Sequence, residues 1–422
     1  MLYERWCRLA RERAAELALR DLPSGREWTF AELHAAGERY ACPDGPAVYP
    51  QDHAPEFLLA ILAAWRLEKI SCPLEPGRPP PPIAGLPAEC VHVKITSATT
   101  RAPRLVAFTA EQLAADAANI TATMGLRPDW PNLGVLSLAH SYGFSNLVLP
   151  LLLHGIPLAL ANATLPEALR HFAAQGSAWT LPAVPALWRT WQEADAMPAQ
   201  VRLAISAGAA LPVELEHAVF DARGLKIHNF YGATECGGIA FDATASPRPD
   251  AALAGSPLQN VELSQAEDGC LAVRSPAVGQ SYWPEPDPRL ANGCFRTSDL
   301  VELRDGTVYL RGRASDLINV AGRKVSPESI EQVLRTHPAI EECLVLGLAS
   351  SVTERADLIA AIVALRHSAT TAELRHFLLD RLPTWQVPRE WWFVDSLSAN
   401  ARGKLSRAEW RQRFAELRRK PG

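Results

Sequence analysis

The sequence predicts an α/β protein with a large N-terminal body, a small β-rich part and a small α+β unit at its C-terminus. At 422 residues the chain exceeds the size at which one hydrophobic core stops growing, so two or more domains are expected. Segments that read as helix and then strand alternate up to about Val261, which is typical of a parallel α/β sheet. Short alternating strands follow, and after Gly312 the pattern predicts a separate unit. We place the domain boundary between residues 1–311 and residues 312–422.

Several segments of the N-terminal body carry helix and strand patterns. Residues 1–20 read as a helix, and residues 27–40 read as a short strand followed by a helix. Residues 54–74 read as a helix and then a strand. The proline-rich segment from Cys72 to Pro87 must be a connector, because proline breaks both helices and strands. Further strands are expected at residues 133–140, 156–161 and 201–208.

The most apolar stretch, residues 144–161, is interrupted by proline, histidine and glycine. A buried helix followed by a buried strand explains it better than a membrane span, which needs about 20 consecutive apolar residues.

Two local motifs predict a turn and a helix start. Asp305 and Gly306 stand between two alternating runs and predict a β-hairpin. Ser326 followed by Pro327 predicts the capped start of a helix.

The composition of the chain argues against several classes of protein. Forty-two basic and 46 acidic side chains give a net charge of −4, which disfavours general binding to nucleic acids or membrane surfaces. The eight cysteines are scattered with no CxxC pair, so we expect no structural zinc site and a cytoplasmic protein with reduced thiols. The N-terminus mixes charges of both signs and lacks the apolar run of a secretory signal.

The segment Ile95–Phe108, ITSATTRAPRLVAF, places four hydroxyl residues within five positions. These residues are Thr96, Ser97, Thr99 and Thr100. Donors packed this densely indicate a cradle for an anion such as phosphate. Phosphate cradles usually contain glycine, because the backbone must approach the anion closely and often takes positive φ. This stretch contains no glycine.

Four other motifs have ordinary explanations when they are taken singly. NFYGATECGG (229–238) fits a glycine-rich loop, and FRTSDLVEL (295–303) fits an edge strand with a solvated aspartate. GRASDLINVAGRKVSPESIE (312–331) fits a turn, a strand and a capped helix. SANARGKLSRAEW (398–410) fits a loop that leads into a basic helix with one exposed lysine.

In chain order these motifs, with the hydroxyl-rich loop and SAGAALP (206–212), resemble the series shared by the adenylate-forming superfamily. That family comprises acyl- and aryl-CoA ligases, luciferases and the adenylation domains of peptide synthetases. The resemblance runs from about Glu56 to Leu405 and is closest in the C-terminal third. It implies that residues 1–311 are a shortened AMP-binding domain and residues 312–422 a mobile lid domain.

The resemblance also implies an AMP-forming acid–thiol ligase. A carboxylate attacks the α-phosphorus of ATP, pyrophosphate leaves, and a thiol then displaces AMP from the acyl-adenylate. Charge builds up on the phosphates in the first step, so catalysis is largely positioning and cationic stabilisation. The implied reaction partners are a small carboxylic acid, ATP, Mg²⁺, and either CoA or the phosphopantetheine of an acyl carrier protein.

The family's motifs assign roles to matching residues of this chain. Glu235 would hold Mg²⁺, Thr234 would face the α-phosphate, and Lys404 would bridge the substrate carboxylate and the α-phosphate. Tyr231 would stack against adenine, and Asp299 would accept both ribose hydroxyls. The remaining nucleotide contacts would come from Thr96, Ser97, Thr99, Thr100, Gly208, Ala209, Asn229, Gly232 and Arg313.

The chain departs from the family in its phosphate loop. The loop keeps the hydroxyl residues, but Ala98, Arg101 and Leu105 replace its three glycines and Arg104 replaces its lysine. We interpret it as a diverged but working loop, because the two carboxylates and the lysine assigned above are retained. Fewer than a hundred residues precede the loop, so by this resemblance we expect a compact member with a shortened N-terminal subdomain.

One block of the sequence bears on the identity of the substrate acid. Amino-acid-activating relatives carry an aspartate near the start of the block that reads LAHSYGF here (138–144), and this block has no carboxylate. An acid without an α-amine is therefore favoured, with His140 either gating the pocket or lying in the core. The expected walls suit an aryl, cinnamoyl-like or medium acyl group and do not choose among them. These walls are His140, Tyr142, Phe144, Val184, Ala207, Phe230, Gly237 and Ile239.

In this family the C-terminal domain rotates between the two half-reactions. The hinge would lie at Ser315, and Gly322 would let a pantetheine arm pass close to the backbone.

Two alternative functions stay open. The first is a stand-alone amino-acid adenylation enzyme that loads a carrier protein. The second is a non-catalytic nucleotide-binding homologue, and the glycine-free loop is its sole sequence support.

Overall fold

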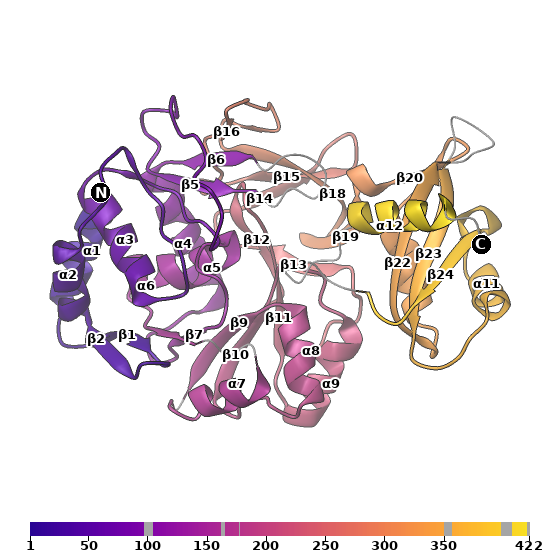
Figure 1. The fold of residues 1–422 in the computed structure, drawn as a ribbon, viewed down its shortest axis with the longest axis horizontal. Coiled ribbons are helices and arrows are strands. Elements are labelled where there is room, and N and C mark those ends of the chain that lie inside the picture. Colours follow the sequence, from indigo (N-terminus) through magenta and orange to yellow (C-terminus); the bar gives the residue numbers. More distant parts are fainter. Residues whose placement is uncertain (97–103, 162–164, 177, 350–356, 398–406, 420–422) are drawn as a thin grey trace.

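The computed structural model describes residues 1–96, 104–161, 165–176, 178–349, 357–397 and 407–419. The chain forms a large α/β body and a smaller α+β unit at its C-terminal end, which confirms the predicted fold class (Figure 1). The main hydrophobic core of the body includes residues from Leu2 to Val308. The buried clusters of the C-terminal unit begin at Ile318.

A sheet of 14 strands runs through the body. Its parallel part is formed, in spatial order, by β11 (Ile227–Ala233), β10 (Val201–Ser206), β9 (Trp179–Ala183), β7 (Asn132–Gly134), β8 (Leu158–Leu160) and β1 (Leu17–Asp21). The helices that follow these strands in the chain are α5 (Ser141–Gly143), a π-helix (Phe144–Val148), α6 (Leu149–His154), α7 (Pro166–Ala173), α8 (Pro185–Glu193) and α9 (Val213–Arg223). The carboxyl ends of parallel strands form an edge where α/β proteins usually bind ligands.

A second sheet of five strands lies beside the first. Its strands, in spatial order, are β16 (Ser281–Trp283), β6 (Leu105–Phe108), β5 (His92–Ile95), β4 (Ile70–Ser71) and β3 (Ala47–Val48). The helices of this end of the body are α1 (Leu2–Glu12), α2 (Phe30–Arg39), α3 (Pro55–Arg66) and α4 (Ala110–Met124). β5 and β6 are antiparallel neighbours, so they bring together the two ends of the hydroxyl-rich loop.

The β-rich part extends the large sheet with antiparallel strands. They are β12 (Gly237–Phe241), β13 (Leu253–Pro257), β14 (Glu262–Gln265), β15 (Cys270–Arg274), β17 (Leu290–Ala291), β18 (Cys294–Arg304) and β19 (Thr307–Arg313), and β2 (Arg26–Thr29) closes the opposite edge. The hairpin predicted at Asp305–Gly306 joins β18 to β19. Both turn residues have positive φ, 47° and 76°, as a type I′ turn requires.

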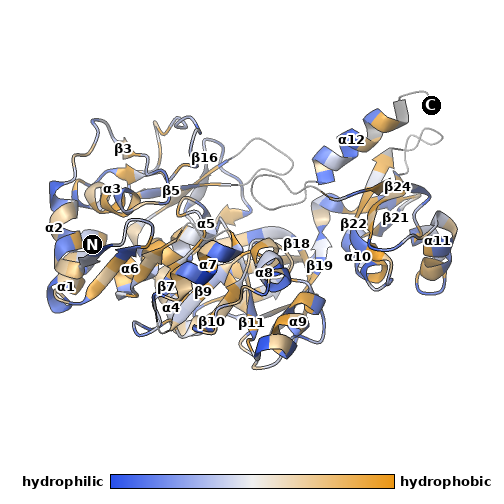
Figure 2. Cartoon of the chain, turned by 60° about the horizontal axis from the view of Figure 1, so that its bottom comes forward, coloured by the Kyte–Doolittle hydropathy of each residue, from blue (hydrophilic) through white to orange (hydrophobic). Residues whose placement is uncertain are grey.

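The C-terminal unit packs helices against a three-stranded sheet. Its elements are a 3₁₀ turn (Ala314–Asp316), β20 (Ile318–Val320), β21 (Arg323–Val325), α10 (Pro327–Arg335), β22 (Ile340–Ala349), β23 (Asp357–Leu365), α11 (Thr371–Leu379), a second 3₁₀ turn (Thr384–Gln386), β24 (Glu390–Val394) and α12 (Arg407–Arg419). Figure 2 shows α12 as a largely hydrophilic helix. Its apolar residues Trp410 and Phe414 are nevertheless buried, and both rings contact Trp392.

Three predicted elements can be compared with the structure. The helix expected over residues 1–20 ends at Glu12, because residues 17–21 pair with β8 and β2 as an additional strand. The apolar stretch 144–161 forms a π-helix, α6 and β8, as predicted. In the part of the chain that the structure describes, no helix is both long and apolar enough to cross a membrane. α10 begins after Ser326, whose hydroxyl donates to the Glu328 carboxylate (2.6 Å) and makes no capping bond to the backbone.

Candidate active site

A cavity of about 190 Å³ lies at the carboxyl ends of β9, β10 and β11. Predicted site residues from these strands and from the 133–146 segment meet in its walls, although they are far apart in the sequence. They are His140, Tyr142, Val184, Ala207, Gly208, Ala209, Phe230, Gly232, Thr234 and Gly237. The cavity therefore lies at the sheet edge where α/β folds usually bind ligands.

Two residues predicted to form walls do not line this cavity. Phe144 is 1% exposed and its ring stacks on His92, with 4.3 Å between the ring centroids. It begins the π-helix, and the next two residues, Ser145 and Asn146, line the cavity instead. Ile239 lies two residues further along β12 than Gly237 and is fully buried in the main core. The expectation that both residues contact the acid is therefore corrected.

One polar side of the cavity was missed by sequence reasoning. Glu75, in the proline-rich connector, accepts a hydrogen bond from the Ser137 hydroxyl (2.7 Å) and lies 3.3 Å from Nε2 of His140. The backbone of Arg78 donates to the Glu75 carbonyl (3.1 Å), and Gly77 between them has a φ of 78°. This is a β-turn with proline second and glycine third, as type II turns prefer. The Pro-Gly pair predicts a turn, but nothing in it indicates a ligand site.

His140 lies in the cavity wall rather than in the core. Its side chain is 41% exposed and faces the Glu75 carboxylate. Of the two positions that the sequence left open for this histidine, the structure therefore favours the one at the pocket.

A buried ion pair supports the wall behind the cavity. The Lys94 ammonium lies 3.4 Å from Oδ2 of Asp116 and donates to the Ser145 hydroxyl (3.0 Å), which in turn donates to Asp116 (2.6 Å). The other oxygen of Asp116 accepts from the Gly238 backbone (3.2 Å). A Cβ on Gly237 would lie only 1.9 Å from that carboxylate, so a glycine is required beside it.

Three residues that the motifs assign to the nucleotide, Tyr231, Asp299 and Arg313, form one hydrogen-bonded group. The Tyr231 hydroxyl donates to one oxygen of Asp299 (2.6 Å), and the Arg313 guanidinium donates to the other (3.0 Å). Asp299 and Arg313 are direct partners across β18 and β19, so the strand register sets this contact. Burial, with the Asp299 charge as a lesser cause, raises the pKa of Tyr231, and the same charge raises the pKa of Arg313. The tyrosine is therefore neutral and the arginine charged at neutral pH.

The Glu235 carboxylate is partly buried and follows Thr234 within its motif. Its Oε1 accepts from the Tyr282 hydroxyl (2.8 Å), and burial raises the pKa of Glu235, which the Tyr282 bond partly offsets. The Arg104 guanidinium lies 3.5 Å from the centroid of the Tyr282 ring and forms an ion pair with Asp287 (3.0 Å). Arg104, which replaces the family's loop lysine, therefore packs on the ring of Tyr282, and the hydroxyl of that tyrosine donates to Glu235.

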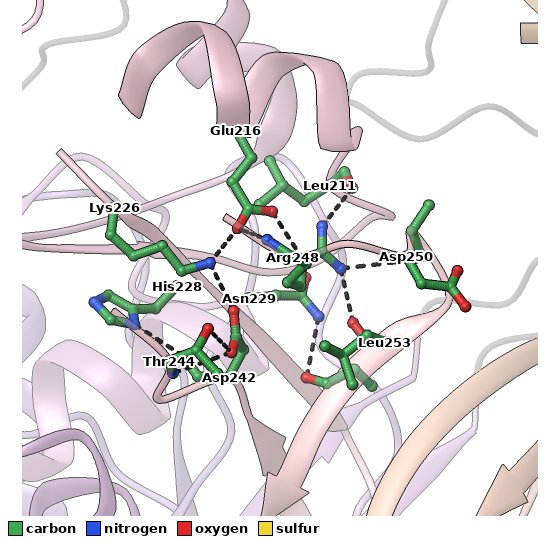
Figure 3. Close-up of polar contacts among 12 residues, drawn as sticks. Leu211, Glu216, Lys226, His228, Asn229, Asp242, Thr244, Arg248, Asp250 and Leu253 are labelled. Atoms are coloured by element: carbon green, nitrogen blue, oxygen red, sulfur yellow. Dashed lines mark hydrogen bonds and ion pairs between the residues drawn. The ribbon is translucent and has the colours of Figure 1, made fainter. Parts of the chain in front are cut away.

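Buried charges surround the strand that carries Asn229. Figure 3 shows Glu216 between Lys226 and Arg248, with Asp242 as the second partner of Lys226. The Lys226 ammonium lies 2.7 Å from Asp242, and Nε of Arg248 lies 2.8 Å from Glu216. These four side chains, two positive and two negative, are each 7% exposed or less.

Arg248 connects this charge network to two segments that contact residues expected to bind the nucleotide. Its guanidinium donates to the carbonyl of Leu211 (2.7 Å), within the SAGAALP segment (206–212), and to that of Leu253 (2.8 Å) (Figure 3). The next carbonyl, that of Ala254, accepts from the Asn229 amide (3.2 Å). One arginine therefore holds both the loop expected to line adenine and β13, the strand that accepts the hydrogen bond of the Asn229 side chain.

Two glycines of the predicted adenine surface stand where the backbone leaves no room for a side chain. Gly208 has a φ of 86°, and a Cβ on Gly232 would lie 2.7 Å from the carbonyl oxygen of Gly237. A larger residue at either position would strain or displace the backbone.

The structure describes only some of the predicted residues of the hydroxyl-rich loop. Thr96 and Arg104 pair at the neck of the hydroxyl-rich loop, where each backbone N–H donates to the other residue, at 2.9 Å in both directions. The remaining loop residues, Ser97, Thr99 and Thr100, lie outside the described residues, as does Lys404.

The predicted hinge and tunnel residues lie in the C-terminal unit. Ser315 is exposed within a 3₁₀ turn, and its hydroxyl donates to Asp316 (3.1 Å). Gly322, with a φ of 87°, forms the turn between β20 and β21, and its N–H donates to the Asn319 side chain (2.9 Å). Positive φ and open space beside Gly322 suit an exposed glycine turn.

Comparison with known proteins identifies the family. The protein-family model for AMP-binding enzymes matches residues 80–283, and the family model for the C-terminal domain of AMP-binding enzymes matches residues 329–404. The 2-succinylbenzoate–CoA ligase of Geobacillus kaustophilus is 30% identical over 342 residues, which cover 76% of this chain and 69% of that protein. The chain belongs to the adenylate-forming superfamily. As such it is an AMP-forming acid–thiol ligase with ATP as a substrate, which confirms the family and reaction type expected from the motifs.

Other members of the superfamily resemble the chain over most of its length. The feruloyl-CoA synthase of an Amycolatopsis species is 27% identical over 388 residues, which cover 86% of this chain and 78% of that protein. ATP-bound MatB from Rhodopseudomonas palustris has the same fold, with a TM-score of 0.86 at 18% identity over 99% of this chain and 100% of that one. The anthranilate CoA ligase AuaEII, in complex with anthranoyl-AMP, gives a TM-score of 0.81 at 19% identity over 99% and 98% of the two chains.

Proposed function

We propose that this enzyme activates an aryl, cinnamoyl-like or acyl carboxylic acid and transfers it to the thiol of CoA or of a carrier-protein phosphopantetheine. One observation carries the proposal. The cavity brings apolar walls suited to an organic acid, Val184, Ala207 and Phe230, against Thr234 of the nucleotide motif. An acid in this cavity would have its carboxylate near the α-phosphate that Thr234 is expected to face. The relatives act on aromatic acids by their names, 2-succinylbenzoate, ferulate and anthranilate, which supports an aryl substrate.

On this proposal each nucleotide-side residue has one task. Tyr231 stacks on adenine while its hydroxyl holds Asp299, and Asp299 accepts from the ribose hydroxyls. Arg313 forms an ion pair with Asp299 and supplies donors to ribose or phosphate. Lys404 would neutralise charge between the attacking carboxylate and the α-phosphate. These groups act by positioning and by electrostatic stabilisation, as phosphate chemistry requires.

We assign Mg²⁺ to Glu235. Mg²⁺ is commonly held by one or two carboxylates together with substrate phosphates, so a single protein carboxylate beside ATP fits it. Within the described ranges no group of three or more His, Cys, Asp or Glu side chains could hold a metal by itself. Burial disfavours the ionised form of Glu235, and a bound cation would restore it. When bound, the ion would neutralise charge on the phosphates.

Incubation with ATP, labelled pyrophosphate and a panel of acids tests this function directly. We expect ATP–pyrophosphate exchange with aryl acids and little exchange with amino acids. Formation of an acyl thioester from CoA, and separately from phosphopantetheinylated carrier protein, then distinguishes the two acceptors. Exchange with amino acids alone would overturn the proposed substrate class, and absence of both exchange and Mg·ATP binding would favour a non-catalytic homologue.

An amino-acid substrate is the second candidate, and Glu75 is the observation that favours it. This residue supplies to the cavity the carboxylate that the 138–144 block lacks. Arg78 of the same turn lines the same cavity and would repel an α-ammonium group. For that reason we rank the acid without an amine first.

We propose that residues 312–422 form a lid that turns at Ser315. β19 ends at Arg313, a 3₁₀ turn follows, and a separate hydrophobic cluster begins at Ile318, which supports a boundary here.

All eight cysteines are unpaired, which supports a cytoplasmic location.

Two variants should separate the half-reactions. Lys404→Ala should lower pyrophosphate exchange by roughly 10²-fold and spare thiol attack on a preformed acyl-adenylate, because the lysine acts on the first step alone. Ser315→Pro should do the reverse, because the proline ring fixes φ at the hinge. Equal loss of both steps in each folded variant would contradict the lid mechanism.

A further inference from the structure

The turn from Glu75 to Arg78 places an acidic and a basic side chain in the wall of the acid cavity. Proline and glycine at its centre, with the backbone bond from Arg78 to Glu75 (3.1 Å), make the turn stiff. Both side chains line the cavity together with His140. Neither residue belongs to a motif that identifies the family.

The two charges of this turn differ in how well they are satisfied. Oε1 of Glu75 is engaged by the Ser137 hydroxyl (2.7 Å) and lies 3.3 Å from the His140 ring nitrogen. Both of these contacts use the same carboxylate oxygen. The guanidinium of Arg78 has no hydrogen bond or ion pair with any residue in the described part of the chain. A ligand group that accepts from Arg78 would therefore gain a bond that the protein leaves unmade.

We propose that the cavity selects an acid with a neutral hydroxyl group besides its carboxylate, such as a hydroxylated aryl acid, and that Glu75 and Arg78 recognise this hydroxyl. A hydroxyl both donates and accepts, so it donates to Glu75 and accepts from Arg78. A second carboxylate would be repelled by Glu75, and an ammonium group by Arg78. The pair therefore discriminates against ions of either sign as well as attracting the hydroxyl. This inference rests on the proposed acid activation.

The size and walls of the cavity agree with one aromatic ring. Its volume is about 190 Å³, and an engineered apolar cavity of roughly 150 Å³ in another protein is known to bind benzene. Two of its walls are the rings of Tyr142 and Phe230, whose centroids lie 5.9 Å apart at an angle of 46°. Such a tilted aromatic pair offers both faces and edges to an aryl substrate.

Four cinnamic acids that differ in a single ring substituent test the inference. The substituents are hydrogen, hydroxyl, aminomethyl and carboxyl, and the readout is kcat/KM in ATP–pyrophosphate exchange. The hydroxylated acid should be preferred about tenfold or more over each of the others, the effect of one net hydrogen bond. Equal rates for all four acids, or preference for a charged one, would overturn the inference and leave the proposed acid activation standing. Absence of exchange with any acid would contradict both.

Two variants test the assigned residues by opposite changes in selectivity. Glu75→Gln leaves Arg78 uncompensated, so the carboxyl-substituted acid should gain about tenfold relative to the hydroxylated one. Arg78→Met leaves Glu75 uncompensated, so the aminomethyl acid should gain by a similar factor. Because each result is a ratio between substrates, partial loss of folded protein does not affect it. Parallel loss with all four acids in both variants would refute the assignment.

Glu89→Gln is the matched control. Glu89 lies two residues beyond the proline-rich connector, is exposed and does not line the cavity. The control should keep the selectivity of the unchanged enzyme. If it altered the substrate ratios as Glu75→Gln does, the effect would come from the general charge in and beside the connector, and the inference would fail.

Discussion

The proposed nucleotide side and the proposed acid side of the site are held in place in different ways. Behind the nucleotide side, Glu216, Lys226, Asp242 and Arg248 are almost completely buried and form one charge network. On the acid side, Glu75 and His140 remain 29% and 41% exposed and depend on one tight turn. Every acid needs the same nucleotide, so its side can be rigid, whereas a partly exposed turn can change without disturbing the core. Changes on the nucleotide side should therefore affect all acids alike, and changes on the acid side should alter their ratio.

Glu235→Gln should have the largest effect on the chemistry. The amide cannot replace the charge that is proposed to hold Mg²⁺, so adenylation should fall on the order of 10²- to 10³-fold with every acid. Exchange rates with three or more acids, measured on protein with an unchanged circular dichroism spectrum, check this prediction. A loss confined to some acids would show that Glu235 belongs to the acid side.

Arg248→Met should have the next largest effect, on stability and on ATP binding together. Removal of one partner from a buried charge network costs about 3–5 kcal/mol, because Glu216 loses a counter-charge. The carbonyls of Leu211 and Leu253 also lose their donor, so the KM for ATP should rise about tenfold while acid ratios stay constant.

The matched control for this variant is Arg296→Met. Arg296 forms a half-exposed ion pair with Asp268 (2.8 Å), and such pairs contribute about 0–1 kcal/mol. Urea unfolding and the KM for ATP, measured on both variants, separate the two positions. A KM for ATP that is unchanged in Arg248→Met would limit this arginine to a structural role.

Tyr282→Phe should give the smallest effect, a shift in pH dependence. The pKa of Glu235 is already raised by burial, and the Tyr282 hydroxyl lowers it in part by bonding the ionised form. Without this bond the pKa should rise further, so the acid limb of kcat/KM should move to higher pH. Well above both pKa values Glu235 is ionised in either protein, and the rates should converge. A shift of the limb to lower pH would contradict the assignment of this carboxylate.

Contiguous motifs were the part of the site that sequence could predict. The segment 229–238 carries Asn229, Tyr231, Thr234 and Glu235 on and after one strand, so its spacing alone places them near one another. The hairpin at Asp305–Gly306 was predicted equally well, because a type I′ turn depends on two adjacent residues. Such features depend on local backbone conformation, which local sequence controls.

Contacts between distant segments were decided by the tertiary structure. Residues 17–21 form a strand instead of the end of a helix because β2 and β8 pair with them. Phe144 turns into the core because a π-helix begins there and presents the following residues to the cavity. Glu75 meets His140 because the turn that follows β4 packs against the segment that follows β7. The sequence by itself determined the family, the fold class and the nucleotide motif, whereas the polar wall of the acid cavity arises from packing between segments some 65 residues apart, which no local pattern encodes.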